Sequence, residues 1–242
     1  TLSSSSAASD VYKRQVQRGA FGACLMETPE QVADCVKAMR DAVSIPVTVK
    51  HRIGLGRQEG YDFVRDFVGK VAAAGCGLFI VHARNAWLDG LSPKENREVP
   101  PLRYDIVHRL KADFPDLTII LNGGLTTHEG ASAAAQGLDG VMFGREAYHN
   151  PWVLAEVDSR WYGMADLSDQ PRSRRVVAEA MAVYAEGFPE LPARVILRHL
   201  LGLYHGQPRA RLWRQRLSGA AAAAVGAAPA LLRSTLDLVD PV

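Results

Sequence analysis

Four short segments of this chain share one pattern of hydrophobic and polar positions. Each is an apolar, mostly β-branched run that ends on polar residues or glycine: IPVTVKHR (45–52), GLFIVHAR (77–84), LTIILNGG (117–124) and LDGVMFGR (138–145). Runs of this length and composition predict buried β-strands. Their ends carry Lys50, His82, Asn122 with Gly123 and Gly124, and Gly144 with Arg145.

Helical periodicity fills the intervals between these runs. Apolar residues recur at helical spacing in 28–43, 61–75, 103–114 and 128–137, with Thr28 as an N-cap, Pro29 in the first turn and Gly75 as a stop. Alternation of helix and strand predicts right-handed βαβ units and a parallel sheet. The chain is therefore expected to be an α/β protein.

The polar strand ends predict a site. Active sites of (β/α)8 barrels lie at the carboxyl ends of the strands, and the loops after the last strands commonly bind phosphate. Paired glycines expose backbone N–H groups to such a ligand, and Arg145 adds a bidentate cation.

Single residues at this edge leave alternatives open. Lys50 could face a reduced flavin, form a Schiff base or simply reach water, and Arg52 shares its face of the strand. His82 could bind a cofactor or move a proton, or be a structural histidine.

The remainder of the chain differs in character. The serine-rich residues 1–15 are aperiodic and are expected to be a non-native or disordered leader, and an orderly pattern begins at Val16. From Ser173 onward the pattern is helical. The expected division is a leader at 1–15, a sheet-containing domain at 16–160 and a helical domain at 161–242.

Composition narrows the class of protein. With 242 residues, 48% of them hydrophobic, and a net charge of +2, the chain is expected to be soluble, without a membrane span or secretory signal. Three cysteines without metal-ligand spacing fit a reducing cytosol and predict no metal site, and the small, apolar neighbours of Cys24 favour a buried, inert thiol.

Arginine is concentrated near the carboxyl end. Between Pro171 and Leu217 only Glu179, Glu186 and Glu190 oppose a set of arginines that could bind phosphates or form a solvated helix surface. They are Arg172, Arg174, Arg175, Arg194, Arg198, Arg209, Arg211, Arg214 and Arg216.

Several motifs together resemble the tRNA-dihydrouridine synthases, specifically the DusA subgroup. They are VQRGAFGACLM, VTVKHRIG, FIVHARNAWLDGLSPKENREVPPL, NGG, VMFGREAYHNPW, RHLLGLYHG and RLWRQRL, and they cover the chain from Val16 to Leu217. The resemblance implies the last four strands of a TIM (β/α)8 barrel followed by an all-α helical domain. It also implies a cytoplasmic oxidoreductase that reduces uridine in the tRNA D-loop to 5,6-dihydrouridine, with FMN as cofactor and NADPH as reductant.

The resemblance also implies roles for individual residues. FMN would be held by Lys50, His82, Asn122, Gly123, Gly124, Gly144 and Arg145. The tRNA would be contacted by Arg52, Lys94, Asn96, Arg97, Arg198, Arg209, Arg211 and Arg214. The target uridine would have to leave its stack to reach the flavin.

One departure from the family pattern affects catalysis. The family's proton-donating cysteine lies in an NVGCPS-type segment that would stand upstream of Val16, and ASDVYKRQ occupies its place, so this chain is expected to supply no catalytic residue. We interpret the chain as an N-terminally truncated fragment that binds FMN weakly or not at all and is inactive alone, although the full-length protein would be an active monomer. The alternatives are another FMN-dependent TIM-barrel oxidoreductase, an RNA-binding fragment without chemistry, and a gene fragment or library artefact without function.

Overall fold

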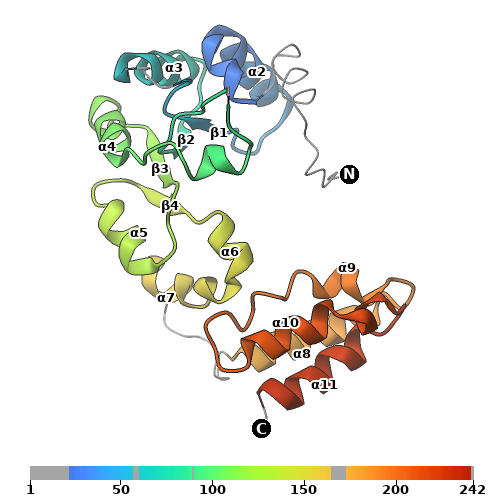
Figure 1. Ribbon diagram of the computed structural model, residues 1–242. Coiled ribbons are helices and arrows are strands. Elements are labelled where there is room, and N and C mark those ends of the chain that lie inside the picture. The colour runs from blue at the N-terminus through green and yellow to red at the C-terminus, as the bar shows by residue number, and fades with distance from the viewer. Residues whose placement is uncertain (1–21, 57–59, 89, 165–172, 241–242) are drawn as a thin grey trace. The chain divides into compact units, whose positions relative to one another are not determined.

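The computed structural model describes residues 22–56, 60–88, 90–164 and 173–240 (Figure 1). It divides into two compact units, Thr1–Met142 and Phe143–Val242, and each is described by itself. The predicted leader at 1–15 lies outside the described residues, and so does Val16, where the orderly pattern was expected to begin. Arg172 and the loop expected before Ser173 lie outside them as well.

A parallel sheet of four strands forms the centre of the first unit. Its strands are β1 (Val49–Arg52), β2 (Leu78–His82), β3 (Thr118–Asn122) and β4 (Gly140–Met142), and they pair in chain order. This confirms the predicted parallel sheet and its strand sequence. The strand β1 begins at Val49, later than the pattern suggested, because Pro46 has no N–H to give to the ladder and Ile45 is exposed.

Helices connect the strands as the periodicity predicted. They are α2 (Pro29–Ala42), α3 (Tyr61–Ala73), α4 (Tyr104–Asp113) and α5 (His128–Ala134), with short 3-10 turns η1 (Gly22–Glu27) and η2 (Glu95–Arg97). Gly75 follows α3 at φ +96°, as expected of a helix stop. Thr28 stands at the N-cap position of α2, but its side chain makes no capping bond and contacts the Leu25 carbonyl oxygen at 3.4 Å.

The two faces of the sheet differ in burial. The side chains of Phe79, Val81, Ile119 and Leu121 are fully buried on the face that we call the helix-side face. Ring contact between His51 and Phe67 joins this face to α3, and α4 packs against β3 (Figure 1). The aliphatic side chains at the alternating positions, such as Ile80, lie on the opposite face, here called the inner face, and are only half-buried, whereas His82 and Asn122 at its carboxyl edge are buried.

The second unit is helical throughout its described residues. It contains α6 (Arg145–His149), η3 (Pro151–Glu156), α7 (Val157–Trp161), α8 (Arg174–Glu186), α9 (Ala193–Leu197), α10 (Ala210–Ser218), η4 (Ala220–Ala223) and α11 (Ala228–Val239). Trp213 is fully buried at its core and donates its indole N–H to the Leu200 carbonyl at 2.8 Å. The fold class, an α/β half-barrel sheet followed by an all-α region, is as predicted.

The two units divide earlier in the chain than the sequence suggested. We expected a boundary between residues 160 and 161, whereas the structure divides between Met142 and Phe143. The reason is local packing: a Cβ on Gly202 would lie 2.1 Å from the His149 carbonyl oxygen, so α6 lies directly against the helical core. No helix within the described ranges is both long and apolar enough to cross a membrane.

Candidate functional site

Strand register brings three of the predicted residues into one row. Arg52 pairs with His82 and His82 with Asn122, so the three residues cross the carboxyl edge of the sheet side by side. Lys50 lies two residues before Arg52 and therefore faces the same side. The pattern of polar strand ends thus reflects one shared edge within the first unit.

Lys50 and Arg52 form a cationic corner on β1. Partial burial, followed by the neighbouring charge of Arg52, lowers the pKa of the Lys50 ammonium. Burial also lowers the pKa of Arg52 to about 10, with the positive charges of Arg97 and Arg84 contributing. A pKa of about 10 keeps Arg52 charged at neutral pH, and the positive charge gathered at this corner favours an anion beside it.

Backbone carbonyls hold Arg52 in place. Its Nη1 donates to the Asn96 carbonyl oxygen at 3.0 Å and to the Asn85 carbonyl oxygen at 3.3 Å. Carbonyl acceptors fix the guanidinium without neutralising it. Arg52 therefore keeps its full charge at the edge of the sheet.

His82 lies against the double glycine that follows β3. Gly123 and Gly124 have φ values of +116° and +70°, a region that glycine occupies at little cost. A Cβ on Gly123 would come within 2.7 Å of His82 Cδ2, and one on Gly124 within 2.5 Å of Leu102 Cδ1. The close approach that paired glycines predicted is therefore present, with side chains of this chain itself as the neighbours.

Asn122 serves partly as a structural residue. Its Nδ2 donates to the Met142 carbonyl oxygen at 2.8 Å, across from β3 to the end of β4. Tyr104 forms a second hydrogen bond to this turn, because its hydroxyl donates to the Gly123 carbonyl oxygen at 2.7 Å. Together these bonds fix the turn of Asn122, Gly123 and Gly124 in one conformation.

Hydrogen bonds restrain the long loop between β2 and α4, residues 85–103, at several of its described residues. Asn96 accepts a hydrogen bond from the Trp87 N–H at 2.7 Å and donates one to the Trp87 carbonyl at 2.6 Å. Arg84 donates to the carbonyl oxygens of Glu98, at 3.0 Å, and Pro100. Sequence reasoning missed Arg84, because nothing in its neighbours along the chain shows that its guanidinium turns back onto this loop.

The predicted RNA contacts of the loop separate into two kinds. Lys94 and Arg97 are exposed, so an outside partner could reach both side chains. Asn96 is half-buried and already bonded to Trp87, unlike the free contact residue that we expected. Ser92 and Glu95 add reciprocal bonds between side chain and backbone that shape the turn between them.

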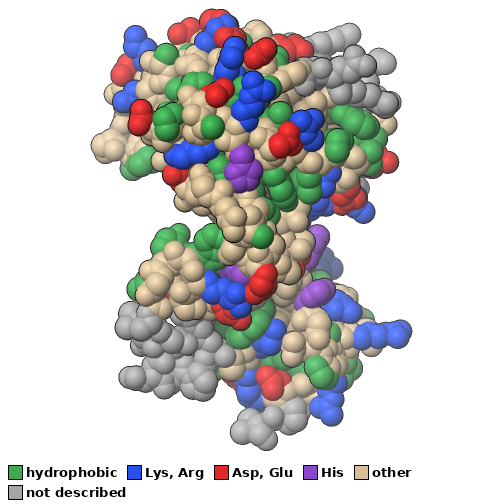
Figure 2. All heavy atoms as spheres, turned by 90° about the vertical axis from the view of Figure 1, so that its left-hand side faces the viewer, with side chains coloured by type: hydrophobic (Ala, Val, Ile, Leu, Met, Phe, Trp, Pro, Cys, Tyr) green, Lys and Arg blue, Asp and Glu red, His purple; other side chains and the backbone are tan. Residues whose placement is uncertain are grey.

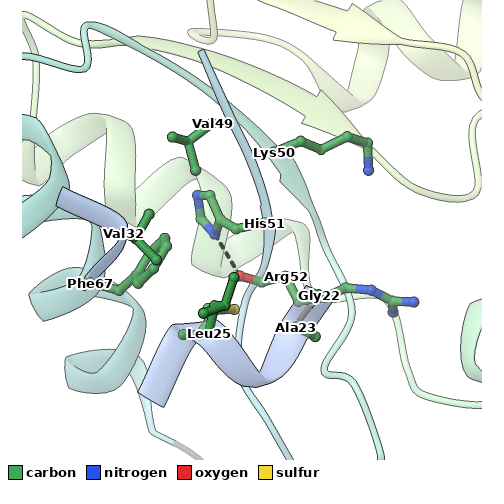
Figure 3. A pocket seen from close by; sticks show the side chains of 10 residues that line it. Gly22, Ala23, Leu25, Val32, Val49, Lys50, His51, Arg52 and Phe67 are labelled. Atoms are coloured by element: carbon green, nitrogen blue, oxygen red, sulfur yellow. Dashed lines mark hydrogen bonds between the residues drawn. The ribbon is translucent and has the colours of Figure 1, made fainter. Parts of the chain in front are cut away.

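His51 is a buried polar residue that the sequence did not single out. Figure 3 shows it on the opposite side of β1 from Lys50 and Arg52, turned toward Phe67. Its Nδ1 donates to the Arg52 carbonyl oxygen at 2.6 Å, and its Nε2 has no partner among the described residues. Burial, the largest effect, lowers the pKa of this imidazole to about 4, so His51 is neutral at pH 7.

A cavity of about 380 Å³ adjoins His51 between η1, α2, β1 and α3 (Figure 3). Apolar side chains such as Leu25, Val32 and Phe67 make up much of its wall. Cys24, in the same 3-10 turn, is half-buried, so the sequence-based expectation of a buried thiol there was wrong. Met26 of the same turn is buried, and Cys24, two residues earlier, faces a different side of the 3-10 turn.

Gly144 and Arg145 belong to the second unit. Gly144 precedes α6, which begins at Arg145, and both residues are exposed. Their predicted contact with a phosphate group stays a prediction.

The arginines of the second unit divide into a paired and an unpaired set. Arg175 pairs with Asp237 at 3.1 Å and Arg233 with Glu186 at 2.7 Å, while Arg174 stacks over the Trp152 ring. The unpaired set is exposed and forms no ion pair with the residues that the structure describes. It consists of Arg194, Arg198, Arg209, Arg211, Arg214 and Arg216.

The outer helices of the first unit show the contrasting pattern. Over α3 and α4, Figure 2 shows basic and acidic side chains interleaved. Lys70, for example, pairs with Glu30 at 2.7 Å and Asp66 at 3.0 Å. Such a surface is nearly neutral locally, whereas the unpaired arginines of α9 and α10 leave a positive one.

The sequence matches one known protein family over most of its length. Residues 13–236 match the family described as dihydrouridine synthase (Dus). The match begins before Val16, the first residue of the motifs that carry the resemblance, and it ends beyond Leu217, the last of them. That the family's proton-donating cysteine belongs upstream of Val16 stays a prediction.

Curated relatives are similar over the same part of the chain. Proteins named tRNA-dihydrouridine(20/20a) synthase from Shewanella oneidensis and Pseudomonas syringae pv. tomato are 54% and 55% identical, each over 84% of this chain and 61% and 60% of their own length. The chain thus spans about three fifths of the length of these relatives.

Solved structures resemble the chain much less. A mandelate oxidase mutant with benzaldehyde matches with a TM-score of 0.31 and 17% identity, over 87% of this chain and 69% of its own. A likeness at that level supports no inference about function. The family match and the identity to its curated members are far stronger, and this chain belongs to the dihydrouridine synthase family.

Proposed function

We propose that this chain supplies the flavin-holding and RNA-holding parts of a tRNA-dihydrouridine synthase, which reduces uridine in tRNA to 5,6-dihydrouridine with NADPH as reductant. The observation that carries the proposal is the row of Arg52, His82 and Asn122 at one edge of the sheet, with Lys50 on the same face. This arrangement gathers cations and hydrogen-bonding groups where barrel enzymes bind their ligands. The activity named for the relatives agrees with it.

The residues at this edge fit FMN. Lys50 offers a cation on the inner face, and the positive φ values of Gly123 and Gly124 turn the backbone sharply beside His82. A backbone turn of this kind can present N–H groups to an anionic or carbonyl oxygen. When bound, FMN would carry hydride from NADPH to the uracil ring. We assign Gly144 and Arg145 to its phosphate on the basis of residue type.

The chain's own residues would bind and orient the reactants. The Lys50 ammonium would stabilise negative charge at the ligand that it faces. Because Asn122 and Tyr104 fix the glycine turn, the binding groups are already in place before a ligand arrives. No cysteine of the described residues lies in the row, so we assign no proton donor and expect no turnover by this chain alone.

RNA would be held by cations at two places. Arg52, Lys94 and Arg97 lie at or beside the loop of 85–103, and the α9–α10 arginines form a second positive surface. Backbone phosphates are the natural ligands of such cations. A uridine would have to leave its stack to reach the strand ends, as base-modifying enzymes require.

Flavin binding tests the first part of the proposal. We expect the 242-residue chain to bind FMN weakly, seen as saturable quenching of FMN fluorescence, and we expect Lys50→Met to abolish the quenching. Lys70→Met is the matched control, because Lys70 lies on the outer helices and pairs with Glu30. No quenching at saturating FMN, or equal quenching by Lys50→Met, would exclude this flavin site.

A second candidate function is RNA binding without chemistry. The exposed, unpaired arginines of α9 and α10 favour it, as does the absence of a cysteine from the row among the described residues. Binding of unmodified tRNA should weaken steeply with salt, and replacing Arg211 and Arg214 by alanine should reduce the slope of log K against log salt by about 1.4 to 1.8. Tight, flavin-independent tRNA binding together with absent FMN binding would select this function.

A further inference from the structure

Asn96 occupies an unusual position in the loop of 85–103. Its side-chain amide forms two hydrogen bonds with the backbone of one residue, accepting from the Trp87 N–H at 2.7 Å and donating to the Trp87 carbonyl at 2.6 Å. This pair of hydrogen bonds resembles the pairing between two strands, and it closes the span of chain between Trp87 and Asn96. The amide thus joins the two arms of the loop.

The backbone of Asn96 has a second function. Its carbonyl oxygen accepts from Arg52 Nη1 at 3.0 Å, and the same nitrogen donates to the Asn85 carbonyl oxygen at 3.3 Å. Arg52 is therefore held by both arms of the loop that Asn96 closes. The placement of this guanidinium at the sheet edge depends on the loop keeping its shape.

Arg97 follows Asn96 directly in η2. The Asn96 carbonyl oxygen that accepts from Arg52 Nη1 is one residue away, so the backbone that carries Arg97 adjoins the Arg52 guanidinium. The positive charge of Arg97 also contributes to the lowered pKa of Arg52, and two like charges at one place favour an anion between them. The bonds from Asn96 to Trp87 hold the backbone beside Arg97.

We propose that Asn96 is a positioning residue that holds Arg52 and Arg97 together as one binding site for RNA phosphate, and that its side chain does not contact RNA. The proposal rests on the proposed RNA-binding function and deepens it. It replaces the role that the family resemblance implied for Asn96. Phosphate contact belongs to the two arginines, and the amide keeps them in place.

A double-mutant cycle on tRNA binding separates positioning from contact. We expect Asn96→Ala in the full 242-residue chain to weaken binding of unmodified tRNA about tenfold and to lower the salt slope by nearly as much as Arg52→Ala and Arg97→Ala combined. In the Arg52→Ala/Arg97→Ala background, Asn96→Ala should then have almost no further effect. A direct RNA contact would instead persist in that background and leave the salt slope unchanged, which would overturn the proposal.

Asn85→Ala is the matched control for loss of an asparagine amide from the same loop. The Asn85 side chain donates to the Gly56 carbonyl oxygen at 3.3 Å, and its backbone carbonyl remains to accept from Arg52. We expect less than about a threefold change in tRNA affinity. An Asn85→Ala effect equal to that of Asn96→Ala would contradict a specific role for Asn96.

Hydrogen exchange of the loop tests positioning without RNA. Asn96→Ala should accelerate exchange of the Trp87 amide at least about tenfold while leaving the amides of β2 and β3 unchanged, because the bond that protects Trp87 is lost. Unchanged exchange at Trp87 would overturn the positioning role. If the unmutated chain failed to bind tRNA while the exchange result held, the proposed RNA-binding function would be wrong. The role of the Asn96–Trp87 hydrogen bonds in restraining the loop would still be supported.

Discussion

The two faces of the four-stranded sheet are built from alternating residues of the same strands, yet they differ in burial and in charge. The helix-side face carries fully buried aromatic and aliphatic residues such as Phe79 and Leu121. The inner face carries Lys50, Arg52 and half-buried aliphatic residues. The apolar burial that stabilises the fold lies mainly on the helix-side face. The candidate binding groups lie on the inner face.

This contrast shows how the fold accommodates a charged side chain whose burial lowers the stability of the folded state. Burial lowers the pKa of Arg52, so keeping its guanidinium charged on the inner face costs stability. The apolar packing on the other side of the same strands offsets that cost. Mutations on the two faces should therefore have opposite consequences for stability and for binding.

The largest expected effect comes from removing a ring on the helix-side face. Phe79→Ala should lower the free energy of unfolding of the first unit by about 3–5 kcal/mol, because Phe79 is fully buried. Hydrogen exchange of the β2 and β3 amides would measure it. The neighbouring Ile80→Ala, on the inner face, should cost about half as much or less, and equal losses at the two positions would contradict the difference between the faces.

The second effect is a pH dependence from His51. Its pKa is about 4 in the folded chain against 6.5 for the free side chain, so between these values the unfolded state binds the proton and the folded state does not. Stability should therefore fall by up to about 3 kcal/mol as pH drops from 6.5 to 4. Lys50 and Arg52 flank His51, and the rings of Phe67 and Phe79 lie against it, so no acidic group in these contacts offsets the effect.

A variant isolates the His51 contribution from the carboxylates that titrate in the same range. His51→Leu should show a shallower loss of stability between pH 6.5 and 4 than the unmutated chain, measured by denaturant unfolding at each pH. Parallel slopes for His51→Leu and the unmutated chain would refute the assignment.

The third effect concerns the double-glycine turn that follows β3. Gly124→Ala should destabilise the first unit by about 1–3 kcal/mol, since Gly124 has a φ of +70° and a Cβ would lie 2.5 Å from Leu102 Cδ1. Gly77→Ala is a suitable control, because Gly77 has no neighbour within 4 Å of such a Cβ. Thermal unfolding would compare the two, and a larger loss at Gly77 would argue against strain at the double-glycine turn.

The smallest stability effect is expected at Lys50. Lys50→Met should change the free energy of unfolding by less than about 0.5 kcal/mol, because the ammonium lies on the half-open inner face without an acidic partner among the described residues. Chemical denaturation would measure it alongside FMN binding. A strong loss of stability would mean that Lys50 is structural and would weaken its assignment as a cofactor contact.

The sequence determined the elements of this protein to a large extent. Alternating apolar runs and helical stretches predicted all four strands and the helices between them, because both periodicities are local and repeat within a few residues. Glycines such as Gly75 marked element ends for the same reason. The family resemblance, carried by motifs such as SPKENR, was confirmed by the family match.

Boundaries and pairings were less predictable. The β1 strand begins at Val49, and the chain divides after Met142, because hydrogen bonding and packing between distant segments set those limits. The half-buried state of Cys24 likewise depends on what covers it in space. None of these properties is encoded in neighbouring residues alone.

The sequence by itself determined the order of strands and helices, and it supplied the residue types for an anion-binding edge. Only the tertiary structure decided that Arg52, His82 and Asn122 form one row, and that Asn96 binds Trp87 instead of standing free. It also decided which arginines are neutralised by carboxylates. The physical reason is that register and side-chain partners arise from contacts between residues far apart in the chain, whereas periodicity reports only the side of an element on which a residue lies.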